Sequence, residues 1–311
     1  MREIKFGYIN YMSQRWTALI FSGVLITIIL ISLAVQGLNY GLDFTGGTVI
    51  EVGYQEPTDI AGIRGELEAA GLTGITVQHF GSTRDVLLRI PPTGETNNAA
   101  LSQKVFDTLS AAAGGKAELR RVEFVGPQVG EELTEQGGLA VLYSIFGILI
   151  YVALRFEWRF SVGAVAATLH DAIICLGVFS IFQLEFDLNV LASILTVIGY
   201  SLNDTIVIFD RVRENFRKIR KGSPLDIMNQ SVNETMSRTI ITAGTVFLVV
   251  VALYLFGGET LRGFSLVMIV GVISGTFSTI YIASNVAVLL GVSRHDLMPI
   301  PKEGPEVDAR P

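Results

Sequence analysis

Charged residues are scarce in this 311-residue chain, and their scarcity argues against an ordinary soluble domain. Lys, Arg, Asp and Glu make up 17% of the sequence and hydrophobic residues make up 50%, whereas soluble domains carry about 25% charge. The charge is missing from particular stretches of the chain. Apolar runs of 18 or more residues are typical of membrane spans, because about 20 helical residues cross a hydrocarbon core of roughly 30 Å.

Cysteine, nucleotide-binding motifs and clusters of metal-ligating residues are equally scarce. Cys175 is the single cysteine, so no disulfide can form within the chain. No G-x-x-x-x-G-K-[ST] segment occurs, which excludes a P-loop nucleotide site. The net charge of -6 is concentrated in residues 37–132, which hold 7 basic and 13 acidic residues. An acidic domain offers no electrostatic footprint for nucleic acid. We therefore expect neither an enzyme nor a bound cofactor or metal.

Six apolar segments predict six transmembrane helices. They cover residues 17–36, 135–154, 160–182, 188–209, 239–256 and 263–290. The first follows three basic residues, as a signal peptide would, but its apolar core is too long and no small-x-small cleavage site follows it. The predicted order is an N-terminal segment at 1–16, a first span at 17–36, a folded head at 37–132, five further spans within 133–290 with a basic loop at 210–237, and a tail at 291–311.

The basic residues of the short loops predict the orientation. Three precede the first span, two lie in Arg155–Arg159, six lie in Arg211–Lys221 and three lie in the C-terminal tail. The alternate loops are nearly free of them. Because Lys and Arg accumulate in cytoplasmic loops, we expect both termini in the cytoplasm and the head outside. The run Arg211–Lys221 also suits contact with anionic lipid. Docking of a cytoplasmic partner on this run is the other interpretation.

The head predicts a small α+β domain. Residues 47–54, 75–80, 86–90 and 117–125 have the composition of strands, and residues 57–70 and 98–113 have the composition of helices. Residues 81–85 are expected to form a hairpin turn. The order β-α-β-β-α-β is that of a ferredoxin-like domain. Since the only histidine of the head is His79 and it has no cysteine, binding of a polypeptide or of a neighbouring head is favoured over catalysis.

Ionisable residues inside the predicted spans are candidates for function, because they are costly there. Asp171 follows His170 in the third span, Asp204 follows Asn203 in the fourth, and Arg238 begins the fifth. They belong to polar stripes at helical spacing, which we expect to face each other as interhelical hydrogen bonds or as a hydrated path. The stripes comprise Ser193, Thr196, Tyr200 and Asn203/Asp204; Thr235, Arg238, Thr242 and Thr245; and Ser274, Ser278, Tyr281 and Asn285.

Simpler interpretations of these residues stay open. Arg238 can reach the cytoplasmic surface with its long side chain, or it can be a static partner of Asp204. His170 and Asp171 can satisfy each other or be satisfied by a neighbouring helix. The functional interpretation is that Asp204 gains and loses a proton. Burial opposes ionisation of a carboxyl group and a nearby arginine favours it. The glycines Gly271 and Gly275 form a G-x-x-x-G pair, which favours close packing of the last span.

Several ordered motifs resemble the SecF branch of the bacterial SecD/SecF protein-export family. The resemblance covers nearly the whole chain, in order. It rests on Leu42-Asp-Phe-Thr-Gly-Gly47, Glu123-Phe-Val-Gly-Pro127, Arg155-Phe-Glu-Trp-Arg159, His170-Asp171, Gly199-Tyr-Ser-Leu-Asn-Asp204-Thr, Asp210-Arg211 and Glu214-Asn-Phe216.

This resemblance implies a function that composition does not. It implies a member of the resistance–nodulation–division superfamily in the bacterial inner membrane, with a periplasmic head. It implies pairing with SecD beside the SecYEG translocon, downstream of the SecA motor, with YajC as a further partner. The proton-motive force would drive the late export of unfolded polypeptides. The family's proton-path residues fall on Asp204 and Arg238, with Asn203, Asp171, His170 and Thr242 as further candidates. Asp43, Gly46 and Gly47 fall in the junction between the first span and the head.

Two other functions compete with export. One is half of a proton-coupled exporter of small molecules or lipids from the same superfamily, which would be expected to carry larger outer domains. The other is an intramembrane aspartyl protease using Asp171 and Asp204. These two residues are expected at different depths, and the sequence lacks a Gly-x-Gly-Asp element.

Overall fold

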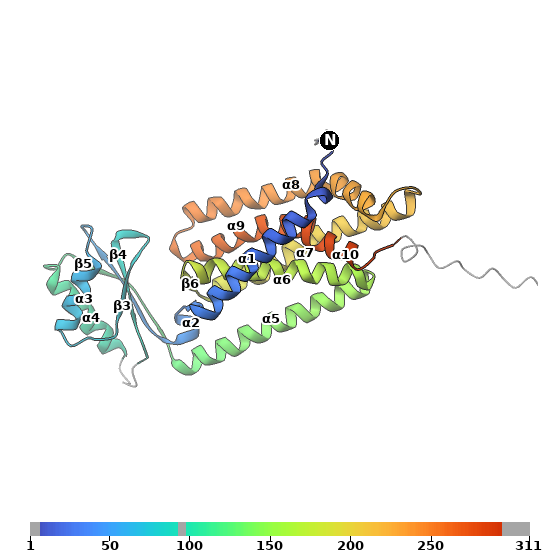
Figure 1. Ribbon diagram of the computed structural model, residues 1–311. Coiled ribbons are helices and arrows are strands. Elements are labelled where there is room, and N and C mark those ends of the chain that lie inside the picture. Colours follow the sequence, from blue (N-terminus) through green and yellow to red (C-terminus); the bar gives the residue numbers. More distant parts are fainter. Residues whose placement is uncertain (1–6, 93–97, 294–311) are drawn as a thin grey trace, which may run out of the picture.

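A computed structural model of the protein describes residues 7–92 and 98–293. It consists of a bundle of long helices with a smaller α/β head at one end (Figure 1). Within the described residues, six helical segments are long and apolar enough to cross a membrane. This agrees with the six spans predicted from the sequence. The predicted tail at 291–311 lies almost entirely outside the described residues.

The bundle helices are longer than the apolar segments that predicted them. A 3₁₀ turn, Tyr11–Gln14, leads into the first helix. The bundle then comprises α1 (Arg15–Val35), α5 (Pro127–Arg155), α6 (Trp158–Ile181), α7 (Leu188–Lys218), α8 (Pro224–Phe256), α9 (Glu259–Ser278), a π-helical turn (Thr279–Ala283) and α10 (Ser284–Leu289).

The prediction of a basic loop at 210–237 is wrong in its structure. Only residues 219–223 separate α7 from α8. The basic stretch continues as helix because Val212 and Phe216 are buried against the bundle, and Arg211 and Lys218 form ion pairs with Glu214 one turn away. A capping box at Ser223 and Asp226 then starts α8 well before its apolar part.

The predicted head boundary at residue 132 is also wrong. The last head strand ends at Val125, and α5 begins at Pro127. Proline suits the first position of a helix, where its missing N–H is not needed. The acidic first turns of α5 therefore extend the second span as helix beyond its apolar core.

The head has the element order β-α-β-β-α-β, in agreement with the sequence. Its elements are β2 (Gly47–Tyr54), α3 (Ile60–Ala69), β3 (Thr76–Phe80), β4 (Ser82–Ile90), α4 (Asn98–Ala112) and β5 (Ala117–Val125). The four strands form an antiparallel sheet in the order β3-β4-β2-β5. The predicted turn at 81–85 is shorter than expected, because residues 82–85 belong to β4.

Both faces of the head sheet are used. One face packs on α3 and α4, with Ile50 and Val52 buried against Ile63, Leu67 and Leu109. Alternate residues of the same strands point the other way, because strand side chains alternate between faces. These form a second apolar cluster of Leu42, Val49 and Leu87, with Phe80 and Val125 packed against it. Leu42 belongs to the short helix α2 (Leu42–Thr45), which connects the bundle to β2.

The bundle core is divided between two apolar clusters. One surrounds Phe160 and Phe209, whose ring centroids are 4.8 Å apart. The other surrounds Phe179, Val190 and Val197, nearer the head. Glycines permit the helices of the bundle to approach one another closely. A Cβ on Gly163 would lie 2.6 Å from the carbonyl oxygen of Ala283. Gly271 faces Val197 and Gly275 faces Ser201, so the predicted G-x-x-x-G pair packs α9 on α7.

The contact at Gly163 gives a prediction about stability. Gly163→Ala should destabilise the bundle by about 1–3 kcal/mol, because the new methyl group meets a backbone oxygen that cannot turn away. Thermal unfolding in detergent would measure the loss. Gly147→Ala is the matched control, since Gly147 on α5 has open space around it. Equal melting temperatures for the two variants would contradict the packing described here.

Candidate functional site

Asp171 is the most completely buried carboxyl group of the bundle site. It is 0% exposed on α6. Three serine hydroxyls donate to its oxygens: Ser201 from α7 at 2.5 Å, and Ser274 and Ser278 from α9 at 2.6 and 2.7 Å. Nδ1 of His170 lies 3.1 Å from Oδ1. One carboxyl group thus joins three transmembrane helices, and its hydrogen bonds compensate for its removal from water.

Small residues allow this cage to form. Gly275 lies one residue after Ser274 on α9, and a Cβ there would lie 3.1 Å from Oγ of Ser201. The helices α7 and α9 can therefore approach closely enough for both to reach Asp171. Ser274 and Ser278 belong to the predicted polar stripe of the last span. Ser201 lies one helical turn before Asp204 but belongs to none of the predicted stripes.

His170 has a second nitrogen available. Its Nε2 is buried and has no hydrogen-bond partner among the described residues. The ring stacks on Phe277, with centroids 6.1 Å apart. A buried polar atom without a partner is uncommon and is often associated with function. Asp171 is thus satisfied by His170 and by the neighbouring helices α7 and α9, as the simpler interpretation allowed. His170 itself is only half satisfied among the described residues.

The last span changes its helical geometry next to this cage. The π-helical turn Thr279–Ala283 starts directly after Ser278. The first residue of this turn is Thr279. Its hydroxyl group shares one hydrogen bond with the hydroxyl group of Thr205 on α7, and the two oxygens are 2.9 Å apart. Single π-helical turns inside α-helices frequently lie at functional sites. Neither threonine belongs to the predicted polar stripes, because nothing in the spacing of the residues marks a π-helix.

Asp204 is buried on α7 and is not part of the cage. It is 4% exposed, and no described residue donates a hydrogen bond to its carboxyl group. Arg238 lies on the neighbouring helix α8, exposed and within electrostatic range of Asp204. The two residues form no ion pair within the described chain. A static Asp204–Arg238 salt bridge is therefore not the arrangement found.

Asp204 and Arg238 nevertheless lie at similar depth. Asp204 follows Leu188, the first residue of α7, by 16 positions, and Arg238 precedes Phe256, the last residue of α8, by 18. At about 1.5 Å per residue both lie roughly 24–27 Å from the head-proximal ends of their helices.

The polar stripes do not all face each other as expected. The serines of the last span point to Asp171 on α6. On α7, Ser193 and Asp204 are buried while Thr196 and Asn203 are exposed. On α8, Thr235 is buried, Thr242 is half-buried and Thr245 is exposed. Part of each of these two stripes therefore faces away from the bundle.

The junction motif Asp43, Gly46 and Gly47 lies at the N-terminal end of α7. Asp43 of α2 accepts a hydrogen bond from the backbone N–H of Leu188 at 2.9 Å. Asp187 caps the same helix end by accepting from the N–H of Val190. Gly46 and Gly47 have positive φ angles of 66° and 118°. A Cβ on Gly47 would collide with the carbonyl oxygen of Ile90, so this turn into β2 requires glycine.

An arginine of the head also reaches this junction. Arg89 of β4 forms an ion pair with Glu185 at 2.5 Å and donates to the carbonyl oxygen of Tyr40. Glu185 belongs to β6 (Glu185–Phe186), which pairs in parallel with β1 (Asn39–Tyr40). Burial raises the pKa of Glu185, while Arg89 opposes the shift. Burial also raises the pKa of Asp187, against the hydrogen bond from Val190.

Two family models match the chain. The model for the C-terminal part of the protein-export membrane proteins SecD and SecF matches residues 105–293, and the model for the SecD/SecF GG motif matches residues 31–58.

The chain belongs to the SecF family.

Curated SecF relatives extend this match over the whole length. The protein translocase subunits SecF of Vibrio alginolyticus and Pseudomonas aeruginosa are each 50% identical to this chain, over 96% and 99% of it and over 96% and 100% of their own length. SecF of Escherichia coli O157:H7 is 45% identical over 98% of this chain and 96% of its own. Membership of the SecF family confirms a multi-pass membrane protein with an accessory, non-enzymatic role in protein export.

Solved structures agree with the SecF assignment. SecDF from Thermus, described as a translocon-associated membrane protein, superimposes with a TM-score of 0.82 at 33% identity over 92% of this chain. A super-membrane-facing form of SecDF gives a TM-score of 0.68 at 34% identity over the same share. This chain spans 39% of the length of either SecDF chain.

The serine cage gives a prediction about stability. Ser278→Ala should lower the free energy of unfolding by about 1–3 kcal/mol, because it removes a donor from a fully buried carboxyl group. Thermal unfolding of the purified protein is the measurement. Thr276→Ala is the control on the same helix, since its hydroxyl bonds only the carbonyl oxygen of Val272. A loss as large in the control would mean that the cage contributes nothing specific.

The junction carboxyl groups give a prediction about pH. A carboxyl group whose pKa is raised in the folded state stabilises the protein below its ordinary value, and this contribution is lost as pH rises through the folded value. Stability should therefore fall as pH rises above the ordinary values of 4.5 for Glu185 and 3.8 for Asp187. The double variant Glu185→Gln/Asp187→Asn should show a flatter dependence, and the asparagine introduced by the second change can still cap α7.

Melting temperatures between about pH 4 and pH 8 would test this pH dependence, with the window set by the ordinary carboxyl values. Glu118→Gln, at an exposed position on β5, serves as the control and should leave the slope unchanged. If the double variant and wild type have parallel curves, the junction carboxyl groups do not govern the pH dependence.

Proposed function

We propose that this SecF-family chain pairs with SecD and uses the proton-motive force to drive the late export of unfolded polypeptides. It acts beside the SecYEG translocon in the bacterial inner membrane, after SecA, with YajC as a further partner. The head is a ferredoxin-like domain in the periplasm, and both termini are cytoplasmic. No cofactor is needed, because the proton gradient supplies the energy.

The isolated carboxyl group of Asp204 is the observation that carries this proposal. A buried ionised carboxyl group without donors is costly inside a membrane, whereas a protonated one is much less so. Arg238 lies at the same depth but outside hydrogen-bonding distance. A proton arriving at Asp204 removes its attraction to Arg238, and loss of that proton restores it. The pair is thus a two-state element of the kind that can shift two helices.

The polar groups along α7 support a route for that proton. The cage at Asp171 lies one helical turn outward from Asp204, through Ser201. The free Nε2 of His170 and the buried hydroxyl of Thr239, which also has no partner among the described residues, supply further proton-carrying groups. Asn203 and Thr242 flank the same region. The different depths of Asp171 and Asp204 suit a relay and not a protease pair.

The outward-facing polar residues of α7 and α8 support pairing with SecD. Thr196, Asn203, Arg238 and Thr245 are exposed on helices that cross the membrane. Polar side chains in this position normally face a protein interior or a hydrated cavity and not lipid. A second helical half covering this face would enclose Asp204 and Arg238. SecD is the partner that the family suggests for this role.

The placement of the basic residues supports the proposed orientation. The N-terminal segment lies at the opposite end of the bundle from the head (Figure 1), where Asn229 and Asn233 of α8 hold its backbone. Arg155 pairs with Asp210 at this same end. A cytoplasmic location of this end follows the positive-inside rule, and its arginines can meet anionic lipid.

The junction supplies a mechanical connection from Asp204 to the head. Asp43 caps α7, the helix that carries Asp204. Arg89 joins β4 to β6, the short strand before α7, through its ion pair with Glu185. A shift of α7 on protonation would move these contacts and hence the head. The alternative of a small-molecule or lipid exporter receives no comparable support, since the relatives described above are all translocase subunits.

The proposal predicts the effect of fixing Asp204 as neutral. Asp204→Asn should abolish the gradient-dependent part of export and leave the gradient-independent part, because no proton can be exchanged at the amide. Arg238→Met should do the same, because it removes the positive charge that responds to the protonation of Asp204. The measurement is the completion rate of export in membrane vesicles with and without a proton gradient, at equal abundance of the chain.

Controls separate this effect from misfolding. Both variants should still co-purify with SecD. Glu131→Gln, an acid-to-amide change at an exposed position of α5, should export at close to the wild-type rate. If Asp204→Asn retains the full response to the gradient, the carboxyl group is structural and the proposed mechanism fails.

A further inference from the structure

A cavity of about 720 Å³ lies between the head and the outer end of the bundle. Its size falls within the range of ligand-binding clefts. From the head it is lined by the sheet face opposite α3 and α4, which includes Val49, Phe80 and Leu87. From the bundle it is lined by the ends of α6 and α9, including Phe179 and Leu266. Two apolar surfaces therefore face each other across an opening at the membrane boundary.

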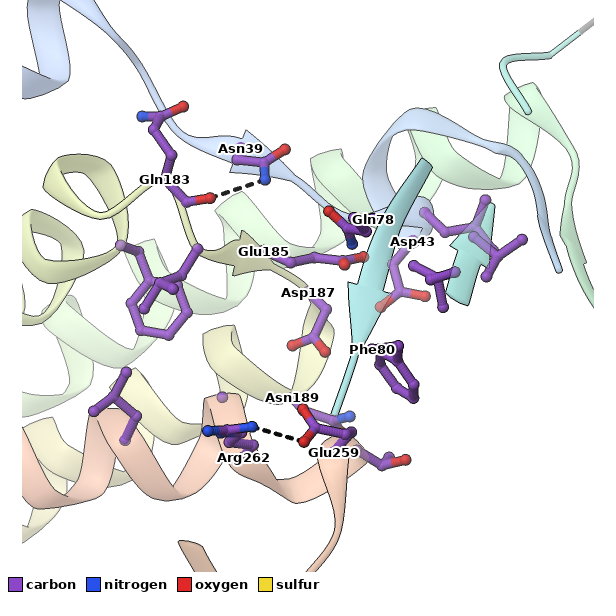
Figure 2. A pocket seen from close by; sticks show the side chains of 18 of the residues that line it. Asn39, Asp43, Gln78, Phe80, Gln183, Glu185, Asp187, Asn189, Glu259 and Arg262 are labelled. Carbon is purple, nitrogen blue, oxygen red and sulfur yellow. Dashed lines mark hydrogen bonds and ion pairs between the residues drawn. The ribbon is translucent and has the colours of Figure 1, made fainter. Parts of the chain in front are cut away.

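The rim of this cavity is acidic. Figure 2 shows Asp43, Glu185 and Asp187 near one another, with Glu259 and Arg262 on the adjoining helix. Six carboxyl groups line the cavity against two guanidinium groups. The carboxyl groups are those of Asp43, Glu51, Glu123, Glu185, Asp187 and Glu259, and the guanidinium groups are those of Arg121 and Arg262.

Pairing does not cancel this negative charge. Arg121 pairs with Glu123, Arg262 with Glu259, and Arg89 of β4 with Glu185, so three of the six carboxyl groups have a cationic partner. Asp43, Glu51 and Asp187 form no ion pair among the described residues and keep the rim acidic. Anionic lipid headgroups are therefore disfavoured as occupants, because binding of such lipids relies on clusters of Lys and Arg. An occupant with cationic groups and apolar groups fits both the rim and the walls.

An open strand edge adds a feature that recognises polypeptide. β3 is an edge strand of the head sheet and pairs only with β4 among the described strands. Its residues Gln78, His79 and Phe80 line the cavity. The free backbone groups of an edge strand can bind an extended chain by main-chain hydrogen bonds, with specificity from neighbouring pockets. A small molecule or a lipid tail would not use them.

We propose that this cavity binds an extended segment of the exported polypeptide, one that carries apolar and basic side chains. The inference rests on the proposed function in export and adds a contact site for its substrate. The segment lies along β3, places apolar side chains between Leu87 and Phe179, and places Lys or Arg beside Glu51. The hairpin at Gly81 lies next to the side chain of Glu259, which lines the cavity.

Photo-cross-linking would test the site in the assembled machinery. The photoreactive residue p-benzoylphenylalanine replaces Phe80, which lines the cavity, or Phe124, which is 52% exposed on β5 outside it. Proteoliposomes contain the full chain with SecD, SecYEG and SecA. The probes are arrested export substrates that carry a Leu/Lys-rich segment, a matched Leu/Glu-rich segment or a Gly/Ser-rich segment.

The site predicts cross-links from position 80 to the Leu/Lys segment in clear excess over position 124. The Leu/Glu and Gly/Ser segments should cross-link less. Glu51→Gln should reduce the yield by about two- to fivefold, the range expected for one partly exposed ion pair, whereas Glu68→Gln, on the exposed side of α3, should not. Equal yields from positions 80 and 124, indifference to the Lys/Glu exchange, or cross-links to lipid alone would overturn the proposal.

The same vesicles distinguish this failure from failure of the proposed function. Export with and without a proton gradient is measured beside the cross-linking. If export keeps its gradient dependence while position 80 shows no preference, the cavity is not a substrate site and the role in export stands. The unfolding temperature of Glu51→Gln should match wild type, because Glu51 forms no ion pair among the described residues.

Discussion

A carboxyl group inside a membrane bundle must find donors, and the way Asp171 finds them organises this protein. Each of its three serine donors comes from a helix that must lie within hydrogen-bonding distance of α6. That requirement brings α7 and α9 together at Gly271 and Gly275, where added Cβ atoms would meet Val197 and Ser201. The π-helical turn follows directly after the cage residue Ser278. A leucine at position 171 would leave the helices free to pack at ordinary separations.

Asp204 differs from Asp171 in a way that bears on function. Both are buried, but one is saturated with hydrogen bonds and the other has none in the described chain. A saturated carboxyl group is fixed in one state by its surroundings. The ionisation of an unsatisfied carboxyl group depends on a balance. Burial opposes the charged form, and a cation some distance away favours it. The first suits a structural centre, and the second suits a group whose charge changes during work.

The connection between bundle and head depends on short polar contacts at one helix end. Asp43 and Asp187 both bind the first turn of α7, and Arg89 joins the head to the preceding loop. These contacts lie next to the acidic cavity. The proposed mechanical connection to the head and the proposed polypeptide site therefore share residues. The glycines at 46 and 47 permit this compact arrangement, because only glycine fits their positive φ angles against the strand ends.

The sequence alone determined the number of spans, the order of strands and helices in the head, the family and the candidate residues. These follow from local properties: apolar length, period-two alternation, and motifs that can be matched in order. It misplaced the loop at 210–237 and the head boundary at 132, because these helices continue beyond their apolar cores. Ion pairs one turn apart support the end of α7, a capping box starts α8, and Pro127 starts α5. Only the tertiary structure decided that Ser201 joins the Asp171 cage, that Arg238 stands apart from Asp204, and that Arg89 reaches Glu185. Those contacts join residues between about 30 and 100 positions apart in the sequence. Which side chains meet across such separations depends on how closely the helices pack. No local sequence pattern specifies that packing.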